Sequence, residues 1–210
     1  MLNYSIVPVT NFYQNCSIWV CTETQLAAII DPGGDLNKII NEINILSCKP
    51  SKILLTHGHI DHIGAAKLLS NKFNIPIVGP HIGDLFWFEG VNGYAEILNM
   101  EPMSPFLPDQ WLEDGMKIKL GDLTFDVLHC PGHTPGHLAF FEKNNAIISV
   151  GDIIFQGSIG RTDLPGGNHE QLIRSIKDKL LPLGENVTFI PGHGPQSTLG
   201  IEKTNNPFLQ

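Results

Sequence analysis

The sequence is poor in positive charge. Its 13 lysines and arginines are outnumbered by 21 aspartates and glutamates, which gives a formal charge of −8 at pH 7. A protein that binds a nucleic-acid backbone needs clustered basic side chains to neutralise the phosphates, and the sequence offers no basic stripe. We therefore expect no nucleic-acid partner.

Long apolar runs are also missing. No stretch approaches the roughly 18 consecutive apolar residues of a membrane-spanning helix. The first residues, Met1 to Tyr4, lack the positively charged start and the following apolar run of a secretory signal peptide. We expect no membrane association and a cytoplasmic location. Hydrophobic residues still form 42% of the 210-residue chain and no linker interrupts it, so we expect one folded domain over residues 1–210.

Cysteine is scarce. The four cysteines, at positions 16, 21, 48 and 130, form no C-x-x-C pair. This pattern argues against a disulfide framework and against a cysteine-rich structural zinc site. Cys130 precedes His133 by three residues, so it either lines a site there or packs in the core.

Short apolar segments separated by turn residues predict a chain of alternating strands and helices. Expected strands cover 5–9, 16–21, 26–31, 53–55, 75–78, 118–120, 123–129, 138–141, 146–150 and 187–190. Expected helices cover 39–48 with Asp35 as the N-cap, 65–73 and 171–181, and the segment 81–110 is expected to be a short helix and an irregular, lid-like loop. The order predicts an α/β protein of two similar halves whose sheets pack together, with helices outside.

The tract His57-Gly58-His59-Ile60-Asp61-His62 places three imidazoles and a carboxylate within six residues, directly after a buried strand. In a loop, His57 and His59 can converge on one cation. Asp61 and His62, at the start of the next helix, can turn toward a second point nearby. Surface histidines or a single structural metal are the alternatives, but a closed structural site is more often rich in cysteine.

Three further candidates follow apolar strands at turns that contain glycine. They are His133 in Pro131-Gly132-His133, Asp152 in Gly151-Asp152, and His193 in Pro191-Gly192-His193-Gly194. Glycine at such turns allows the backbone to approach a shared site without an intervening side chain.

This combination resembles the metallo-β-lactamase superfamily, whose marks are an H-x-H-x-D-H tract followed by a histidine, an aspartate and a final histidine. The resemblance spans residues 5–194 and implies a four-layer αββα sandwich with the site at the edge of the two sheets. It implies that one metal ion is held by His57, His59 and His133, a second by Asp61, His62 and His193, and that Asp152 bridges them. We expect two divalent ions, zinc first, with iron and manganese as alternatives.

Two ions about 3.5–4 Å apart suit hydrolysis, because they can share a water, lower its pKa and polarise a carbonyl. The metal-bridging hydroxide would then be the nucleophile, with Asp61 and Asp152 as the carboxylates of the catalytic centre. No serine or cysteine nucleophile is needed.

The tract from Gly151 to Gly167 resembles the glyoxalase II branch of this superfamily, and more narrowly a short bacterial subgroup. The resemblance implies a hydrolase of S-(2-hydroxyacyl)glutathione thioesters such as S-lactoylglutathione. Arg161 is expected to hold a carboxylate of the glutathione-derived substrate, and a salt bridge with Asp163 is its alternative role. Only 17 residues follow His193, whereas longer glyoxalase II enzymes append a helical domain with further glutathione-binding groups.

A mononuclear iron persulfide dioxygenase of the same superfamily is the alternative activity. It would use His57, His133 and Asp152 and shares the Gly-Arg-Thr-Asp tract, but Leu164-Pro165-Gly166-Gly167 resembles the hydrolases more. The β-lactamase branch, the nucleases and a metal-binding domain without activity are less favoured.

Three other residues complete the expectations. His137 is expected to stabilise the turn behind His133. Asn15 and Phe12 either overhang the cleft or form an ordinary turn. The sequence predicts no oligomeric state.

Overall fold

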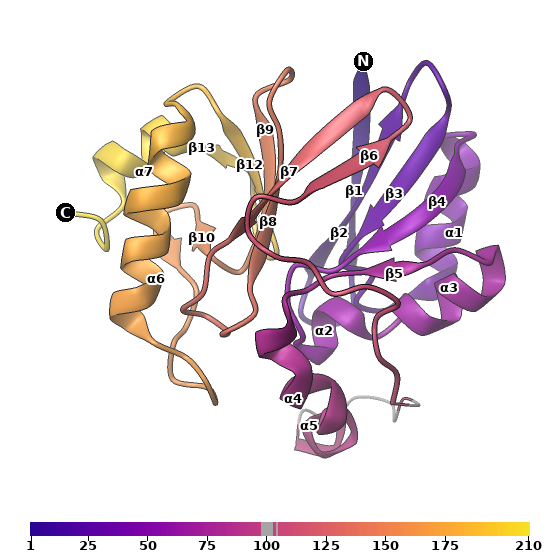
Figure 1. Ribbon diagram of the computed structural model, residues 1–210, viewed down its shortest axis with the longest axis horizontal. Helices are drawn as coiled ribbons and strands as arrows, with labels where there is room; N and C mark the ends of the chain where they lie inside the picture. The colour runs from indigo at the N-terminus through magenta and orange to yellow at the C-terminus, as the bar shows by residue number, and fades with distance from the viewer. Residues whose placement is uncertain (98–102, 104) are drawn as a thin grey trace.

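Two β-sheets pack face to face in the centre of the molecule, and helices cover the outer face of each sheet (Figure 1). The computed structural model describes residues 1–97, 103 and 105–210. In Figure 1, α1 and α3 lie outside the N-terminal sheet and α6 and α7 lie outside the C-terminal sheet. The arrangement is the predicted αββα sandwich.

The N-terminal sheet has five strands in the order β1-β2-β3-β4-β5. The strands are β1 (Leu2–Val9), β2 (Gln14–Cys21), β3 (Leu26–Ile30), β4 (Lys49–Leu54) and β5 (Ile77–Val78). The first three pair antiparallel, as predicted, whereas β4 and β5 pair parallel. Parallel neighbours need long crossovers. These contain α1 (Leu36–Ile45), α2 (Ile60–Ile63) and α3 (Ala66–Phe73).

The C-terminal sheet has six strands in the order β13-β12-β9-β8-β7-β6. The strands are β6 (Lys117–Leu120), β7 (Leu123–His129), β8 (Leu138–Glu142), β9 (Ile147–Gly151), β12 (Thr188–Pro191) and β13 (Ser197–Thr198). The helices of this half are α6 (His169–Ser175), continued by a π turn (Ile176–Leu180) and a 3-10 turn (Leu181–Leu183), and α7 (Leu199–Asn205). A separate hairpin consists of β10 (Ile154–Phe155) and β11 (Ser158–Ile159).

The core consists of three apolar layers. Between the sheets, Trp19 and Phe125 meet edge to face with ring centroids 5.3 Å apart. Alternate residues of one strand enter different layers, because successive side chains point to opposite faces of a sheet. In β2, Trp19 enters the central layer and Ile18 enters the layer under the N-terminal helices. Both faces of these strands are therefore buried, which explains their continuous apolar character.

The structure differs in part from three expectations, on the cap of α1, on one strand and on the segment 81–110. Asp35 is the N-cap residue of α1, as predicted, but its side chain makes no capping hydrogen bond. It adopts a left-handed conformation, and its carboxylate accepts hydrogen bonds from the Thr10 N–H and from Lys38. The strand predicted at 75–78 covers only Ile77–Val78.

The segment 81–110 contains more helix than predicted. It has a 3-10 turn (Ile82–Asp84) followed by α4 (Leu85–Glu89) and α5 (Val91–Ile97). Part of the predicted lid-like loop, residues 98–102 and 104, lies outside the described residues.

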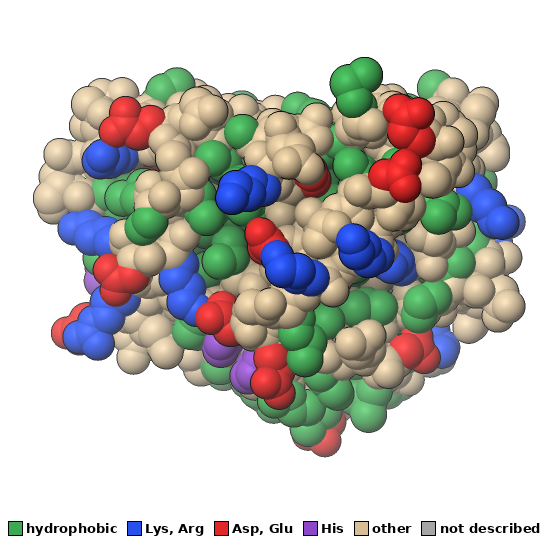
Figure 2. Space-filling model, turned by 45° about the horizontal axis from the view of Figure 1, so that its top comes forward, with side chains coloured by type: hydrophobic (Ala, Val, Ile, Leu, Met, Phe, Trp, Pro, Cys, Tyr) green, Lys and Arg blue, Asp and Glu red, His purple; other side chains and the backbone are tan. Residues whose placement is uncertain are grey.

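Surface charges are mixed on the face shown in Figure 2, where lysine and arginine side chains lie among acidic ones. Within the part of the chain that the structure describes, no helix has the length and apolar character needed to cross a membrane.

A buried carboxylate connects α7 to the β10–β11 hairpin. Glu202 is 1% exposed. It accepts hydrogen bonds from the Gly157 N–H at 2.8 Å, from the Ser197 hydroxyl at 2.6 Å and from Asn206 Nδ2 at 2.9 Å. Asn206 in turn donates to the carbonyl oxygens of Phe155 and Ser158. The hairpin is thus held by the C-terminal helix.

Replacing Glu202 with alanine should lower the free energy of unfolding by about 2–4 kcal/mol, because three donors lose their common acceptor inside the protein. Urea denaturation followed by circular dichroism measures this loss. Glu170→Ala is the control, because Glu170 is exposed and its contact with Arg174 is a surface pair at 3.9 Å. Equal effects of the two substitutions would contradict the role of Glu202.

Candidate metal centre

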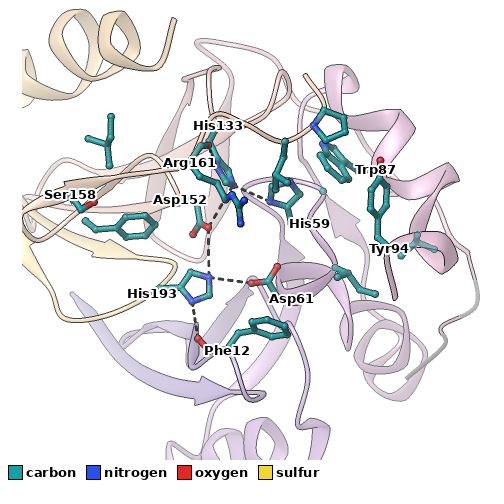
Figure 3. A pocket seen from close by; sticks show the side chains of 17 residues that line it. Phe12, His59, Asp61, Trp87, Tyr94, His133, Asp152, Ser158, Arg161 and His193 are labelled. Carbon is teal, nitrogen blue, oxygen red and sulfur yellow. Dashed lines mark hydrogen bonds and ion pairs between the residues drawn. The ribbon is translucent and has the colours of Figure 1, made fainter. Parts of the chain in front are cut away.

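The seven candidate ligands meet at one edge of the sandwich, where four strands end. His57 and His59 follow β4, and Asp61 and His62 lie in α2. His133 lies in the loop between β7 and β8, Asp152 follows β9, and His193 follows β12. Figure 3 shows His59, Asp61, His133, Asp152 and His193 directed toward one another around a common space. The structure therefore brings together every ligand that the sequence predicts.

Three imidazoles form the first group. One nitrogen each of His57, His59 and His133 lies within 4.8 Å of the others. His59 Nδ1 is 3.1 Å from His57 Nε2 and 3.0 Å from His133 Nε2. All three side chains are buried, so water does not separate these nitrogens.

Asp61, His62 and His193 form the second group, and their nearest ligand atoms also lie within 4.8 Å of one another. Asp61 Oδ2 is 3.2 Å from His193 Nε2 and 3.8 Å from His62 Nε2. The two groups have the same members as the two ligand sets that the family resemblance implies.

Asp152 lies between the two groups. Its Oδ1 is 3.4 Å from His62 Nε2, and its Oδ2 is 3.6 Å from His133 Nε2 and 3.7 Å from His193 Nε2. One carboxylate thus faces both groups, which is the position that a bridging ligand requires.

In four of the histidines, the ring nitrogen that points away from the shared space, here called the outer nitrogen, has a partner that favours metal binding by the other nitrogen. These four nitrogens face oxygen atoms: His57 Nδ1 faces Thr56 Oγ1, His62 Nδ1 faces Asp31 Oδ2, His133 Nδ1 faces the Arg161 carbonyl, and His193 Nδ1 faces the Phe12 carbonyl. Carbonyl and carboxylate oxygens only accept, and the Thr56 hydroxyl already donates to Asp31. In a neutral imidazole each outer nitrogen therefore carries the proton, and the inner nitrogen then presents a lone pair to the shared space.

Three buried atoms at this centre have no hydrogen-bond partner among the described residues: His59 Nε2, His62 Nε2 and Asp152 Oδ1. Buried polar atoms are normally satisfied, so two unpaired atoms that face each other across 3.4 Å indicate a missing positive charge. Imidazole nitrogens with carboxylate oxygens suit zinc, iron or manganese. The residues present therefore fit divalent metal ions.

The electrostatics agree with this conclusion. Burial lowers the pKa of His57 well below its usual range and lowers the pKa of His59 to about 3, which keeps both imidazoles neutral and able to bind a cation. Burial also lowers the pKa of His62, but the carboxylates of Asp152 and Asp61 outweigh it and raise that pKa. The second group is thus electron-rich and attracts positive charge.

Asp31 is a supporting residue that the sequence analysis did not identify. It follows β3 and accepts hydrogen bonds from the Thr56 N–H at 2.7 Å, the Thr56 hydroxyl at 2.6 Å and His62 Nδ1 at 2.9 Å. Asp31, His57 and His62 also form a compact group of possible ligands. Because both oxygens of Asp31 are already used, its role is to orient His62 and, through Thr56, His57. The only sequence signal was an aspartate at the end of an apolar strand.

Asp84 is a second supporting residue that was missed. This buried carboxylate accepts hydrogen bonds from the Gly58 N–H, the Thr134 hydroxyl and the Gly136 N–H at 2.6–2.8 Å. Burial raises the pKa of Asp84 to about 6, against the effect of these three donors. Asp84 thereby connects the loop that carries His57 to the loop that carries His133.

The remaining histidines and Cys130 have the structural roles that were expected or left open. His137 Nε2 accepts a hydrogen bond from the Asp152 N–H at 3.0 Å, which confirms a turn-stabilising role. His81 and His129 stack on each other away from the centre. Cys130 is fully buried in the layer under α6, so of its two alternative roles the structure shows core packing.

A glycine is required at position 192 because Asp152 and His62 lie too close to this backbone to leave room for a side chain. A Cβ at Gly192 would lie 2.1 Å from Asp152 Oδ1 and 2.6 Å from His62 Cε1. Gly132, by contrast, provides room for the backbone of Leu172 in α6 rather than for the centre. The predicted reason for glycine at these turns therefore holds at 192 but not at 132.

A cavity of about 710 Å³ opens onto both groups of ligands. Arg161 lines it, but its Nε and Nη2 are bonded to the two carboxylate oxygens of Asp163 at 2.8 and 2.7 Å. The structure thus contains the salt bridge that was the alternative role of Arg161. Phe12 lines the cavity, whereas Asn15 does not: its amide donates to the carbonyls of Pro191 and Gly194 and holds the loop of His193.

The sequence is similar to those of known proteins. The model of the metallo-beta-lactamase superfamily matches residues 10–193. The hydroxyacylglutathione hydrolase GloC of Haemophilus influenzae is 46% identical over 209 residues, which cover 99% of this chain and 98% of that protein.

Two solved structures are also similar over nearly their whole lengths. BLEG-1 B3 metallo-beta-lactamase is 36% identical with a TM-score of 0.91, and the match covers 99% of both chains. TTHA1623 in a di-iron-bound form is 38% identical with a TM-score of 0.89, and the match covers 98% of this chain and all of that one. The chain belongs to the metallo-beta-lactamase superfamily.

Proposed function

We propose that this protein is a binuclear metallohydrolase that cleaves S-(2-hydroxyacyl)glutathione thioesters such as S-lactoylglutathione. The observation that carries the proposal is the pair of ligand groups that share Asp152 at the floor of an open cavity. The similarity to a protein named hydroxyacylglutathione hydrolase supports the choice of substrate class.

The ligands would be divided as follows. His57, His59 and His133 would hold one divalent ion, Asp61, His62 and His193 the other, and Asp152 would contact both. Bound at these positions, two ions lower the pKa of a shared water and polarise the thioester carbonyl. Zinc is the expected metal, and iron is a specific alternative because TTHA1623 has been solved with two irons.

The protein contributes orientation and exclusion of water. Asp31 and Thr56 fix the rings of His62 and His57, and backbone carbonyls fix those of His133 and His193. Such support for ligands typically accounts for one to two orders of magnitude in metal affinity or activity. The apolar cavity walls keep bulk water away from the thioester, which strengthens electrostatic interactions at the centre.

Hydrolysis of β-lactams is a second candidate function, because BLEG-1 is named a B3 metallo-beta-lactamase. A mononuclear iron persulfide dioxygenase, which would need only His57, His133 and Asp152, is the other alternative. These two activities use other substrates, β-lactams and persulfides, so parallel assays distinguish them from thioester hydrolysis.

Purified protein should contain close to two equivalents of divalent metal per chain and should hydrolyse S-lactoylglutathione, because the chain provides two complete ligand groups. Elemental analysis and release of free thiol measure these two properties on the same sample. A nitrocefin assay and oxygen uptake with glutathione persulfide serve as comparisons. A single iron with oxygen uptake, or β-lactam hydrolysis without thioester hydrolysis, would contradict the proposal.

Asp61→Ala should reduce the metal content to about one equivalent and the thioesterase kcat by two orders of magnitude or more, because Asp61 contributes to the second group alone. Circular dichroism should remain unchanged. Asp35→Ala is the control, since this carboxylate lies at the start of α1 and bonds Lys38. Full metal content and turnover in Asp61→Ala would exclude the two-metal arrangement.

Arg161→Ala should raise KM for S-lactoylglutathione about tenfold at nearly constant kcat, if the guanidinium holds a substrate carboxylate in the ground and transition states alike. Asp163→Ala is the matched test, because it frees the guanidinium from its present partner. We expect Asp163→Ala to leave KM unchanged or to lower it. A similar rise of KM in both variants would show that Arg161 acts through its salt bridge with Asp163 and not through a contact with the substrate.

A further inference from the structure

The cavity above the metal centre has two walls of different chemistry. One wall comes from α4 and α5 and contains Trp87, Val91 and Tyr94. The other wall comes from the β10–β11 hairpin and the chain that follows it, and is also largely apolar, but it contains Arg161 beside Phe155, Ile159, Leu164 and Pro165. In Figure 3, Trp87 and Tyr94 lie beyond His59, while Ser158 lies on the far side of Asp152.

Positive charge is confined to the hairpin wall. Among the described residues that line the cavity, Arg161 is the single lysine or arginine. The sequence from 81 to 116, which contains α4 and α5, has no lysine or arginine at all, and Glu89 and Glu96 of these helices are exposed acids. The glutathione half of a thioester carries two carboxylates and one ammonium. A glutathione carboxylate that replaces Asp163 as the partner of Arg161 is therefore favoured on the hairpin side, and the α4–α5 wall offers it no cationic partner.

The acyl half must then face α4 and α5, because the thioester carbonyl has to lie over the ligands between the two walls. This side offers an aromatic column that starts at the metal centre. The His59 and Trp87 rings meet edge to face at 4.3 Å, and the Trp87 and Tyr94 rings follow at 4.4 Å. Val91 packs beside them as a third apolar side chain of the cavity.

The indole of Trp87 also has an unsatisfied donor. Trp87 is 3% exposed, and its Nε1 has no hydrogen-bond partner in the part of the chain that the structure describes.

From these observations we infer an acyl-binding subsite, formed by Trp87, Val91 and Tyr94, that selects 2-hydroxyacyl thioesters with an aromatic or branched apolar side chain. This inference rests on the proposed thioesterase function. The methyl group of a lactoyl thioester is too small to cover this wall, whereas the phenyl ring of a mandeloyl thioester can contact both Trp87 and Tyr94. Additional apolar contact of this kind improves kcat/KM as long as the contact persists in the transition state.

Hydrolysis of S-mandeloylglutathione and S-lactoylglutathione by the metal-loaded wild-type protein tests the inference. We expect kcat/KM to be about tenfold or more higher for the mandeloyl thioester, the lower end of what one extra apolar group contributes in a fitted pocket. Tyr94→Ala should lower kcat/KM for the mandeloyl thioester about tenfold and change that for the lactoyl thioester less than about twofold.

Phe155→Ala is the matched control, because Phe155 is the aromatic residue of the other wall. It should affect both substrates to the same extent, since they share the glutathione half. Circular dichroism and metal content should match the wild type in both variants. Equal or better hydrolysis of the lactoyl thioester, or equal losses for both substrates in Tyr94→Ala, would overturn the subsite while leaving the thioesterase function in place. Hydrolysis of neither thioester would instead reject the proposed function.

Discussion

The geometry of the centre depends on one buried carboxylate. Asp152 faces His62 with one oxygen and His133 and His193 with the other, so it connects two ligand groups that come from both halves of the sandwich. Burial alone would raise the pKa of Asp152, but the surrounding imidazoles, His62 first, hold that pKa far below its usual range. An ionised carboxylate in such a place is stable only with positive charge beside it. The loops around it are arranged to supply that charge.

The sandwich makes this possible because the strands that carry the ligands end at the same edge. The loops at that edge are then fixed by two further buried carboxylates. Asp31 holds the start of the loop after β4 and the ring of His62, and Asp84 ties that loop to the loop of His133. Each of these carboxylates accepts three hydrogen bonds, so the backbone donors of loops that must remain irregular are satisfied inside the protein. The precise position of the ligands therefore follows from polar contacts as well as from apolar packing.

The sequence predicted the ligands better than the residues that hold them. His57, His59, Asp61 and His62 were visible because four candidate ligands within six residues have no ordinary structural explanation. Asp84 meets Gly58 and Gly136 across 26 and 52 positions, and no local pattern encodes such contacts. The layers followed from apolar periodicity. Asp35 lies at the predicted N-cap of α1, but its side chain does not cap the helix because its carboxylate accepts a hydrogen bond from the Thr10 N–H instead. Local propensity specifies elements, but tertiary contacts decide which partner a polar side chain takes.

The two walls of the cavity would determine how a substrate is oriented over the metal centre. The two ligand groups both face Asp152, and neither contains a group that would distinguish the thiol half of a substrate from its acyl half. Direction comes from elements outside them: α4 and α5 contribute aromatic surface and no basic residue, and the hairpin contributes Arg161 close to its end. The hairpin is in turn held by Glu202 and Asn206 of the C-terminal segment, which lies beyond the family-matched residues 10–193. Substrate orientation thus depends on peripheral elements that can change while the metal centre stays the same.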